Sequence, residues 1–588
     1  MSLALEMQHI TKIYGEVRAN DDVSIQAAAG EVLCIIGENG AGKSTLMNVL
    51  YGMTRPDGGT IRIGGKEVSF RSSRDAMRHR IGMVFQHFML VKELSCQENI
   101  IIGMEPAKHF VIDRKAAKTK IEALMDQYGM RVALEKPAGE LSVGEQQKLE
   151  IIKVLYRGAD IIILDEPTAV LTPQETAELF VNIRQLAVAG KTVIMITHKL
   201  DEVMQVADRI VVMRMGKVVG ETKPADTDVH GLSVAMVGAE IPPMRERKET
   251  RKEKALEVCG VTCRNEDGIA VLDCLSMVVN KGEILGVAGI SGNGQPELAR
   301  VVTGLLKPQE GKVLLMGEDI TAHDRKKRIQ DGISFIPEDR NSTGACLDWS
   351  IEDNCIAGYQ DRFTGRLDVI DREKARTFTE SMIQAFRIKT PDGRLPISSL
   401  SGGNCQKVIV ARETAFQPEL VVAAEPTRGV DIGAISAIHN HMIELRNEGT
   451  AVLLISSSLD EIFELSDRIA VMYAGKIVEY GDARQVFYRP SHPYTWGLLG
   501  AMPNLIQDVK SELYAIPGTP PDLYAPPKGC AFAARCPYAM EACLKEDPPE
   551  FACGQGHGSR CWLLDPRAPD VTPPEGIPPL PKGGSDHV

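Results

Sequence analysis

Residues 31–50, EVLCIIGENGAGKSTLMNVL, contain the segment that decides the fold. Their middle, GENGAGKST, fits the pattern G-x-x-x-x-G-K-[S/T], with an apolar run before it and a helical pattern after it, as this pattern requires. Glycines at these positions let backbone N–H groups approach a phosphate at the start of a helix, where the helix dipole favours an anion. The alternative is a glycine-rich turn with a solvated lysine, and the flanking strand and helix argue against it. The segment therefore predicts a phosphate-binding loop in an α/β domain.

Two side chains of this loop have expected roles of their own. Lys43 would reach the β- and γ-phosphates of a nucleotide, and the Ser44 hydroxyl would ligate Mg²⁺. The other loop residues would surround the phosphates mainly through the main chain; they are Gly37, Glu38, Asn39, Gly40, Ala41, Gly42 and Thr45.

Five residues elsewhere in the first half of the chain complete the candidate site. Asp165 ends the apolar run IIIL and would hold Mg²⁺ directly or through water, while Glu166 would orient or deprotonate the attacking water. Gln86 would reach the metal and the water, and His198 would contact the γ-phosphate. Tyr14 would stack on adenine. Taken singly, the acidic pair would be a helix cap and His198 and Tyr14 would be structural, so these residues gain weight only as a set.

The sequence contains an internal repeat. GEVLCIIGENGAGK, from Gly30, recurs as GEILGVAGISGNGQ from Gly282, and LSVGE at 141–145 recurs as LSGGN at 400–404. A repeat of about 250 residues is a duplicated domain rather than a unit of a solenoid. We therefore expect two α/β domains in one chain.

Composition changes along the chain suggest where these domains end. We expect a first domain at 3–240, a charged, exposed linker at 241–254 (IPPMRERKETRKEK) and a second domain at 255–482. A cysteine-rich extension at 483–565 and a disordered Pro/Gly-rich tail at 566–588 follow.

The overall composition limits the classes of function. The chain has 588 residues and a net charge of −12, a balance that argues against a general nucleic-acid binder. It contains no apolar run approaching the ~20 residues needed to span a bilayer. We therefore expect a cytosolic protein whose membrane role, if any, depends on a partner; its thirteen cysteines are then not expected to form disulfides.

The ordered set of Tyr14, GENGAGKST, Gln86, LSVGEQQ, LDEPT and His198 resembles an ABC transporter ATPase domain. Shorter stretches of sequence, such as MVFQHFMLV, resemble the tandem-domain ATPases of sugar and nucleoside importers. The resemblance implies two P-loop ATPase domains, each with a parallel-sheet core and antiparallel β and helical subdomains. It also implies ATP and Mg²⁺ as cofactors, and head-to-tail pairing of the domains, with each ATP held between the phosphate loop of one and the LSGGQ-type segment of the other.

Losses in the second copy are not random. Its replacements are Gln295 for Lys43, Pro296 for Ser44, Ala424 for Asp165, Ser457 for His198 and Glu338 for Gln86. The second copy nevertheless keeps LSGGN, whereas the first has the off-consensus LSVGE. One composite site, formed by the first phosphate loop with Ser401, Gly402 and Gly403, is therefore expected to hydrolyse ATP. The other is expected to be degenerate.

The extension contains Cys530, Cys536, Cys543 and Cys561 in the spacing C-x₅-C-x₆-C-x₁₇-C. It resembles the C-terminal extension of oligopeptide and dipeptide importer ATPases, which implies that these four cysteines hold a [4Fe–4S] cluster. Zinc and unligated thiols are the alternatives, with Cys553 and His557 as spare ligands. Because few apolar residues surround the cysteines in the sequence, we expect a metal centre to order this segment.

The resemblances together imply the ATPase subunit of an importer, bound to permease subunits at the inner face of the cell membrane and served by a substrate-binding protein. A nucleoside or sugar is the favoured solute, and the extension leaves an oligopeptide possible. The alternative is a soluble ABC ATPase acting on a ribosome or another macromolecule, against which the acidic charge balance argues. A non-catalytic scaffold is a third possibility, disfavoured by the intact first loop.

Overall fold

The computed structural model describes residues 3–238, 243–248, 252–500 and 527–574, apart from residues 16, 87, 109, 110, 169, 170, 172, 291, 366–368 and 431. The chain divides into two units, Met1–Pro242 and Pro243–Val588. Each unit is described here by itself.

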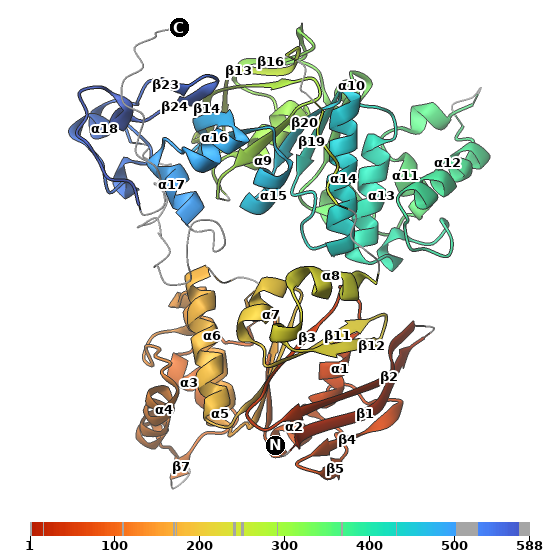
Figure 1. Ribbon diagram of the computed structural model, residues 1–588, viewed down its shortest axis with the longest axis vertical. Helices are drawn as coiled ribbons and strands as arrows, with labels where there is room; N and C mark the ends of the chain where they lie inside the picture. Colours follow the sequence, from red (N-terminus) through yellow and green to blue (C-terminus); the bar gives the residue numbers. More distant parts are fainter. Residues whose placement is uncertain are drawn as a thin grey trace. The chain divides into compact units, whose positions relative to one another are not determined.

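A six-stranded sheet forms the centre of the first unit, in the order β12-β11-β3-β10-β9-β6 (Figure 1). Its strands are β3 (Val32–Ile36), β6 (Ile81–Val84), β9 (Ile161–Asp165), β10 (Thr192–Thr197), β11 (Arg209–Arg214) and β12 (Lys217–Thr222). All neighbouring pairs are parallel except β11 with β12. The carboxyl ends of β3, β10, β9 and β6 therefore lie along one edge, and the expected parallel core is confirmed.

An antiparallel sheet and two groups of helices complete the first unit (Figure 1). The sheet contains β1 (Leu3–Tyr14), β2 (Val17–Ala28), β4 (Gly58–Ile63) and β5 (Lys66–Val68). The first group of helices packs with the sheets and contains α1 (Lys43–Leu50), α2 (Ser73–Arg78), α6 (Pro173–Val188), α7 (Leu200–Val206) and α8 (Val229–Val237). The second group contains α3 (Cys96–Ile101), α4 (Arg114–Tyr128) and α5 (Val143–Tyr156), together with the short hairpin β7 (Ala107–Lys108) and β8 (Val111–Ile112). One core joins the two sheets through α1, and includes Leu5, Leu33, Leu46 and Ile163.

The second unit repeats this plan. Its larger sheet has the order β18-β19-β20-β15-β21-β22-β24-β23, and its first six strands match the first unit in order and direction. These strands are β15 (Ile284–Ala288), β18 (Ile333–Ile336), β19 (Leu420–Ala424), β20 (Ala451–Ile455), β21 (Arg468–Tyr473) and β22 (Lys476–Asp482). The antiparallel sheet is formed by β13 (Lys254–Arg264), β14 (Ala270–Asn280), β16 (Glu310–Leu315) and β17 (Glu318–Asp319).

The helices of the second unit also correspond to those of the first. They are α9 (Gln295–Val302), α10 (Arg325–Gln330), α11 (Ile351–Ile356), α12 (Arg372–Ala385), α13 (Gly402–Thr414), α14 (Ile432–Glu448) and α15 (Leu459–Leu465). Helices α11, α12 and α13 pack together as α3, α4 and α5 do. The duplication seen in the sequence is therefore a duplication of the fold.

The C-terminal extension adds to the edge of the second unit's sheet (Figure 1). It contains α16 (Ala483–Tyr488), α17 (Pro493–Gly500), α18 (Glu541–Lys545), β23 (Phe551–Gly554) and β24 (His557–Ser559), and β24 pairs antiparallel with β22. Glu479 of β22 is fully buried and accepts hydrogen bonds from the backbone N–H groups of Ser491 and His492, and its carboxylate lies 2.8 Å from Nε2 of His557. A buried carboxylate needs such partners.

An apolar cluster orders the extension as well. Trp496, Cys561, Leu563 and Leu564 are buried together, with further aromatic and sulfur-bearing side chains packed around them. The expectation that few apolar residues surround the cysteines is therefore wrong, because those residues come from several segments of the extension. A metal centre is not needed to explain why this segment is ordered.

Part of the predicted linker belongs to the second unit. Its described residues, 243–248 and 252–254, are exposed, yet Arg247 Nη1 donates to the Ser466 carbonyl at 2.8 Å and the Arg245 N–H donates to Asn440 at 2.9 Å. Residues 241, 242 and 249–251 of the linker and residues 575–588 of the predicted disordered tail lie outside the described residues. Within the described part of the chain, no helix is long and apolar enough to cross a bilayer.

Candidate functional site

The phosphate loop of the first unit connects β3 to α1 at the carboxyl edge of the parallel sheet. Gly42, the residue before α1, has φ +96°, and a Cβ there would lie 2.2 Å from the Ala19 carbonyl oxygen. Only glycine adopts this conformation without strain and fits this space. Asn39, Gly40 and Ser44 are exposed, so the outer side of the loop is open to a ligand.

The remaining loop residues line or support this turn. Gly37 and Ala41 are buried, while Glu38 and Thr45 are half-buried. Lys43 is 6% exposed, and its ammonium donates to the Gly37 and Glu38 carbonyls at 2.6 and 3.0 Å. Burial lowers the pKa of Lys43, and the nearby carboxylates of Glu166, Asp165 and Glu38 oppose that shift. A bound triphosphate would supply the negative charge that this ammonium needs.

Asp165 is the last residue of β9 and faces the start of α1. The hydroxyl of Ser44 hydrogen bonds to its carboxylate. Burial and the neighbouring Glu166 raise the pKa of Asp165 above its usual range, because two carboxylates close together disfavour a second negative charge. A hydroxyl and a carboxylate in contact, beside a second carboxylate, are oxygen ligands suited to Mg²⁺, so the residues fit the expected metal.

Three side chains from three strand ends form a hydrogen-bonded group. Gln86, after β6, donates to Glu166 Oε2 at 3.1 Å, and His198 Nδ1, after β10, lies 2.9 Å from Glu166 Oε1. The hydrogen bond from His198 is the largest cause of the lowered pKa of Glu166, and burial opposes it. Glu166 is thus held as a carboxylate with both oxygens oriented, as a base for water requires.

Tyr14 lies apart from this group, at the end of β1. Its ring is 48% exposed, with Lys12 Nζ 5.3 Å from the ring centre and its hydroxyl 3.5 Å from Thr54 Oγ1. An exposed aromatic face on a hairpin end is available to stack on a base.

The loop of the second unit is occupied by its own side chains. Gln295 Nε2 donates to the Ile290 carbonyl at 3.1 Å, and Gln295 Oε1 accepts from the Asn293 N–H at 3.2 Å. The hydroxyl of Tyr494, in α17, accepts from the Ile290 N–H at 3.0 Å. Tyr494 was not found from the sequence, because it lies in the extension and belongs to no motif.

The acidic residues of the second unit are also arranged differently. Glu425 accepts from the Ser457 N–H at 2.6 Å, and burial raises its pKa. Glu338, which replaces Gln86, pairs with Arg428 at 2.6 Å. Ala424 offers no metal ligand. A pocket remains here, lined by Gln295, Pro296, Ala424, Glu425 and Ser457 among others, but Gln295, Pro296 and Ala424 do not supply the ammonium of Lys43, the hydroxyl of Ser44 or the carboxylate of Asp165.

The two LSGGQ-type segments begin corresponding helices. Ser142 precedes α5 and Ser401 precedes α13, and each serine caps its helix. Ser401 is exposed, Gly402 is half-buried and Gly403 is buried. A serine hydroxyl and N–H groups at a helix start favour an anion.

The four predicted cluster cysteines gather in the extension, with no disulfide among the described cysteines. Backbone N–H groups donate to each sulfur: Phe532 to Cys530, Tyr538 to Cys536, Met540 to Cys543 and Leu563 to Cys561. Burial raises the pKa of Cys561, and the negative charge that Cys536, Cys530 and Cys543 would carry as thiolates adds to that shift.

Among the described residues, no three Cys, His, Asp or Glu side chains are placed to hold a metal ion. His557, named above with Cys553 as a spare ligand, has its Nε2 2.8 Å from Glu479 Oε1.

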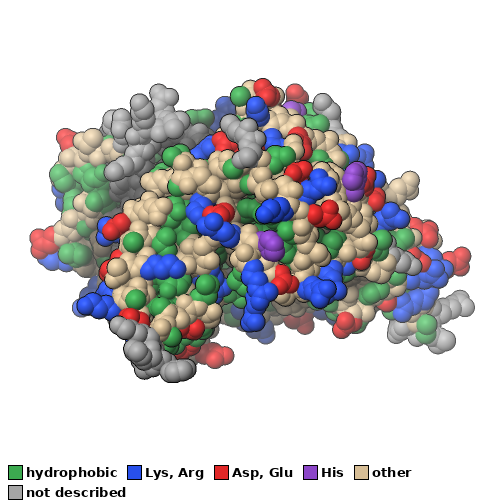
Figure 2. All heavy atoms as spheres, turned by 90° about the horizontal axis from the view of Figure 1, so that it is seen from below, with side chains coloured by type: hydrophobic (Ala, Val, Ile, Leu, Met, Phe, Trp, Pro, Cys, Tyr) green, Lys and Arg blue, Asp and Glu red, His purple; other side chains and the backbone are tan. Residues whose placement is uncertain are grey.

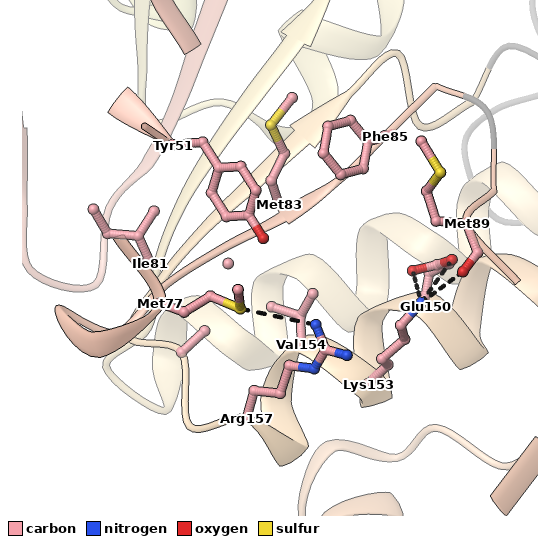
Figure 3. A pocket seen from close by; sticks show the side chains of 12 residues that line it. Tyr51, Met77, Ile81, Met83, Phe85, Met89, Glu150, Lys153, Val154 and Arg157 are labelled. Carbon is pink, nitrogen blue, oxygen red and sulfur yellow. Dashed lines mark hydrogen bonds and ion pairs between the residues drawn. The ribbon is translucent and has the colours of Figure 1, made fainter. Parts of the chain in front are cut away.

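A groove on the first unit (Figure 3) is lined by Phe85, the residue that precedes Gln86 in the sequence. Tyr51, Met77, Met83, Phe85 and Met89 line one side, and the C-terminal half of α5 lines the other. Lys153 of α5 donates to the Met89 carbonyl at 2.8 Å and lies 3.4 Å from Glu150. Helix α5 therefore connects the first LSGGQ-type segment at its start with this groove near its end.

The surface seen in Figure 2 mixes charges of both signs. Lys and Arg side chains are interspersed with Asp and Glu side chains on this face rather than forming one continuous basic patch.

Comparisons with known proteins agree with these observations. A family model described as "ABC transporter" matches residues 20–169 and 272–428, and one described as "Oligopeptide/dipeptide transporter, C-terminal region" matches residues 478–543. The guanosine import ATP-binding protein NupO of Bacillus subtilis is 43% identical over 480 residues, which cover 81% of this chain and 94% of that protein.

Two further relatives are similar over the same region. The nucleoside import ATP-binding protein NupA of Lactococcus lactis is 42% identical over 475 residues, or 80% of this chain and 94% of that protein. The glucose import ATP-binding protein TsgD13 of Haloferax volcanii is 40% identical over 507 residues, or 81% and 92%.

Proposed function

The chain belongs to the ABC transporter family, and on that premise we propose that it hydrolyses ATP at one composite site to drive an importer. It is the ATPase subunit of that importer, as are the import ATP-binding proteins to which it is similar. The observation that carries the single-site proposal is the asymmetry between the units. Lys43, Asp165 and Glu166 are assembled in the first unit, whereas in the second unit Gln295 replaces Lys43 and Ala424 replaces Asp165.

Each residue of the first unit's site would have a separate role toward the bound ATP. Lys43 would exchange its loop carbonyls for β- and γ-phosphate oxygens, while Ser44 and Asp165 would hold Mg²⁺, which neutralises charge that develops on the phosphates. Glu166 would accept a proton from the attacking water, with Gln86 and His198 orienting it. Ser401, Gly402 and Gly403 of the second unit would close over the γ-phosphate, so that hydrolysis requires both units.

The second phosphate loop would close without turnover. Its own Gln295 and the Tyr494 hydroxyl already take up hydrogen-bonding groups of the loop. A carboxylate base without a positioned nucleotide has nothing to activate, so Glu425 would be inactive. Nucleotide binding and hydrolysis at the first site, and reopening after phosphate release, would then set the cycle.

The groove of Figure 3 is the surface that we assign to a permease subunit. It is lined by methionine and aromatic side chains, which suit an apolar helix from a partner. It lies between the segment that holds Gln86 and helix α5, so the two parts of the unit that would move at ATP closure both contact the occupant. Through the permease, the chain would act at the cytoplasmic face of the membrane, with a substrate-binding protein delivering the solute.

A nucleoside or a sugar is the solute that we propose. Two of the compared relatives are named for guanosine or nucleoside import and one for glucose import. Because the extension matches the oligopeptide/dipeptide transporter region, a peptide is the competing solute. Uptake of labelled guanosine, glucose and a dipeptide by cells with and without this chain would decide among the three.

For the extension, we propose a [4Fe–4S] cluster on Cys530, Cys536, Cys543 and Cys561. Amide donors to each sulfur would stabilise bound thiolates. The cluster would have a structural role rather than a role in electron transfer, because the sequence shows no redox-partner motif. Anaerobically purified protein should contain about four irons per chain, and colourless protein containing zinc would exclude the cluster.

The composite-site proposal is tested by three variants of the full chain. Lys43→Ala and Glu166→Gln should each reduce ATP turnover by more than about a hundredfold, because each removes a group that acts only on the reacting phosphate or water. Gln295→Ala, the matched change in the second unit, should leave turnover within about twofold. Normal turnover in Glu166→Gln would contradict the assignment.

A further inference from the structure

Carboxylates already occupy the start of the first unit's LSGGQ-type helix. Glu145 Oε2 accepts from the Ser142 N–H at 2.9 Å, and Glu175 Oε1 accepts from the Gly144 N–H at 3.1 Å. The N–H groups that would meet a phosphate are thus bonded to two negative side chains. A phosphate approaching Ser142 would have to displace or overcome both of them.

Neither carboxylate is present at the second unit's segment. Asn404 takes the position of Glu145, and Ala434 takes the position of Glu175. The Asn404 amide donates to Ser401 Oγ at 2.8 Å, and its carbonyl oxygen accepts from Lys389. Among the described residues, the N–H groups of Gly402 and Gly403 have no protein acceptor.

An arginine from a different segment lies against this helix start. Arg340 begins a short helical turn after β18, and Asp339 holds that turn by accepting from the Asn341 and Ser342 N–H groups at 2.9 and 3.3 Å. Arg340 Nη1 donates to the carbonyls of Arg428 and Gly429 at 2.8 and 3.3 Å. One guanidinium therefore joins the segment after β18 to the segment after β19.

The other side of the same guanidinium faces Gly402. A Cβ on Gly402 would lie 2.6 Å from Arg340 Nη2, so a side chain there would displace the arginine. The first unit has Val143 at this position. The glycine of LSGGN thus leaves room for a guanidinium, half-exposed, beside the free N–H groups and the Ser401 hydroxyl.

We propose that Arg340 is a further phosphate-binding residue, which adds a charged donor to Ser401, Gly402 and Gly403 where they meet the γ-phosphate of ATP held by the first unit. The inference rests on the composite site proposed above. Nη1 is fixed on two carbonyls, so the guanidinium is positioned before ATP arrives, and Nη2 remains on the side of the serine and glycines. A planar guanidinium suits a phosphate better than a flexible ammonium does.

The test compares ATP with ADP, because only ATP has the γ-phosphate that Arg340 would contact. In the full chain with Glu166→Gln, which prevents turnover, Arg340→Gln should weaken Mg–ATP binding about ten- to a hundredfold, the range for a lost hydrogen bond to a charged group. Binding of ADP should change by less than about twofold. Arg340→Lys should recover part of the ATP affinity, because it retains the charge but not the fork.

A purely structural role for Arg340 would give a different result. If Arg340 only holds Arg428 and Gly429 in place, Arg340→Gln should weaken ATP and ADP binding to the same extent. Arg340→Lys should then recover no ATP affinity. Arg394→Gln is the matched control: Arg394 belongs to the same unit and pairs with Asp392 at 2.5 Å on an exposed loop. It should leave both affinities unchanged.

The outcomes separate this inference from the composite-site proposal. If Lys43→Ala and Glu166→Gln abolish turnover while Arg340→Gln leaves the ATP-to-ADP affinity ratio unchanged, the role of Arg340 is wrong and the composite site stands. If Glu166→Gln turns over normally, the composite site itself fails.

Discussion

Replacing Tyr494 by phenylalanine tests whether the extension holds the second phosphate loop. The Tyr494 hydroxyl accepts from the Ile290 N–H at 3.0 Å and from Asn293 Nδ2 at 3.4 Å. Its ring packs against the rings of Tyr473 and Phe532, with centres 4.6 and 5.6 Å away. Phenylalanine keeps the ring in this cluster and removes only the oxygen, so the change isolates the hydrogen bonds.

The expected cost follows from the part-buried position of this hydrogen bond. Removing the acceptor of such an N–H costs about 1–2 kcal/mol, and 1.4 kcal/mol is a tenfold change in an equilibrium. Amide hydrogen exchange in the peptide that covers the loop should therefore become about five- to thirtyfold faster. ATP turnover should be unchanged, because the first unit supplies the reacting residues.

A matched change elsewhere in the unit provides the control. Tyr480→Phe removes a hydroxyl that donates to Glu550 at 2.6 Å, away from the loop, so it should not alter loop exchange. If Tyr494→Phe also leaves exchange unchanged, or if both variants accelerate it equally, the extension does not hold this loop.

Three further results are expected. In His198→Ala, the pKa of Glu166 should rise toward its usual value, because the His198 hydrogen bond is the main cause of its lowering. Glu166 must be ionised to accept a proton, so the acid limb of the turnover–pH profile should move to higher pH. An acid limb at the same pH as in the unmodified chain would contradict this. His557→Ala should destabilise the attachment of β24 by about 1.5–3 kcal/mol, through loss of a hydrogen bond to buried Glu479, seen as faster amide exchange in residues 557–559 while the first unit is unaffected. Met89→Glu, at a 61% exposed groove residue, should lower solute uptake and permease co-purification by more than about tenfold with ATPase activity retained; equal loss in the control Met53→Glu, 57% exposed, would argue against docking in the groove.

Much of the first site could be predicted from the sequence, because its chemistry is carried by local motifs at strand ends. The phosphate loop, the acidic pair and His198 each follow a run of buried β-branched residues. The carboxyl ends of parallel strands share an edge, so strand assignment alone places such residues together. The repeat likewise predicted that Gln295 and Ala424 would replace Lys43 and Asp165 at corresponding positions.

The cysteine segment shows where sequence reasoning failed. Its apolar neighbours were missed because Trp496 precedes the cysteines and Leu563 follows them, so no local window contains the cluster. Pairing of β24 with β22 was missed for the same reason: a three-residue strand has no readable pattern.

The sequence by itself determined the duplicated α/β fold, the complete phosphate loop of the first unit and the losses in the second, because each depends on neighbouring residues. Only the tertiary structure decided that Tyr494 bonds to the second loop, that Glu175 covers the first LSGGQ-type helix and that Arg340 lies against Gly402. In each pair the two residues are distant in the chain, and Tyr494, Glu175 and Arg340 belong to no motif. Packing brings them together, and hydrogen bonding between partners that packing has selected cannot be read from either segment alone.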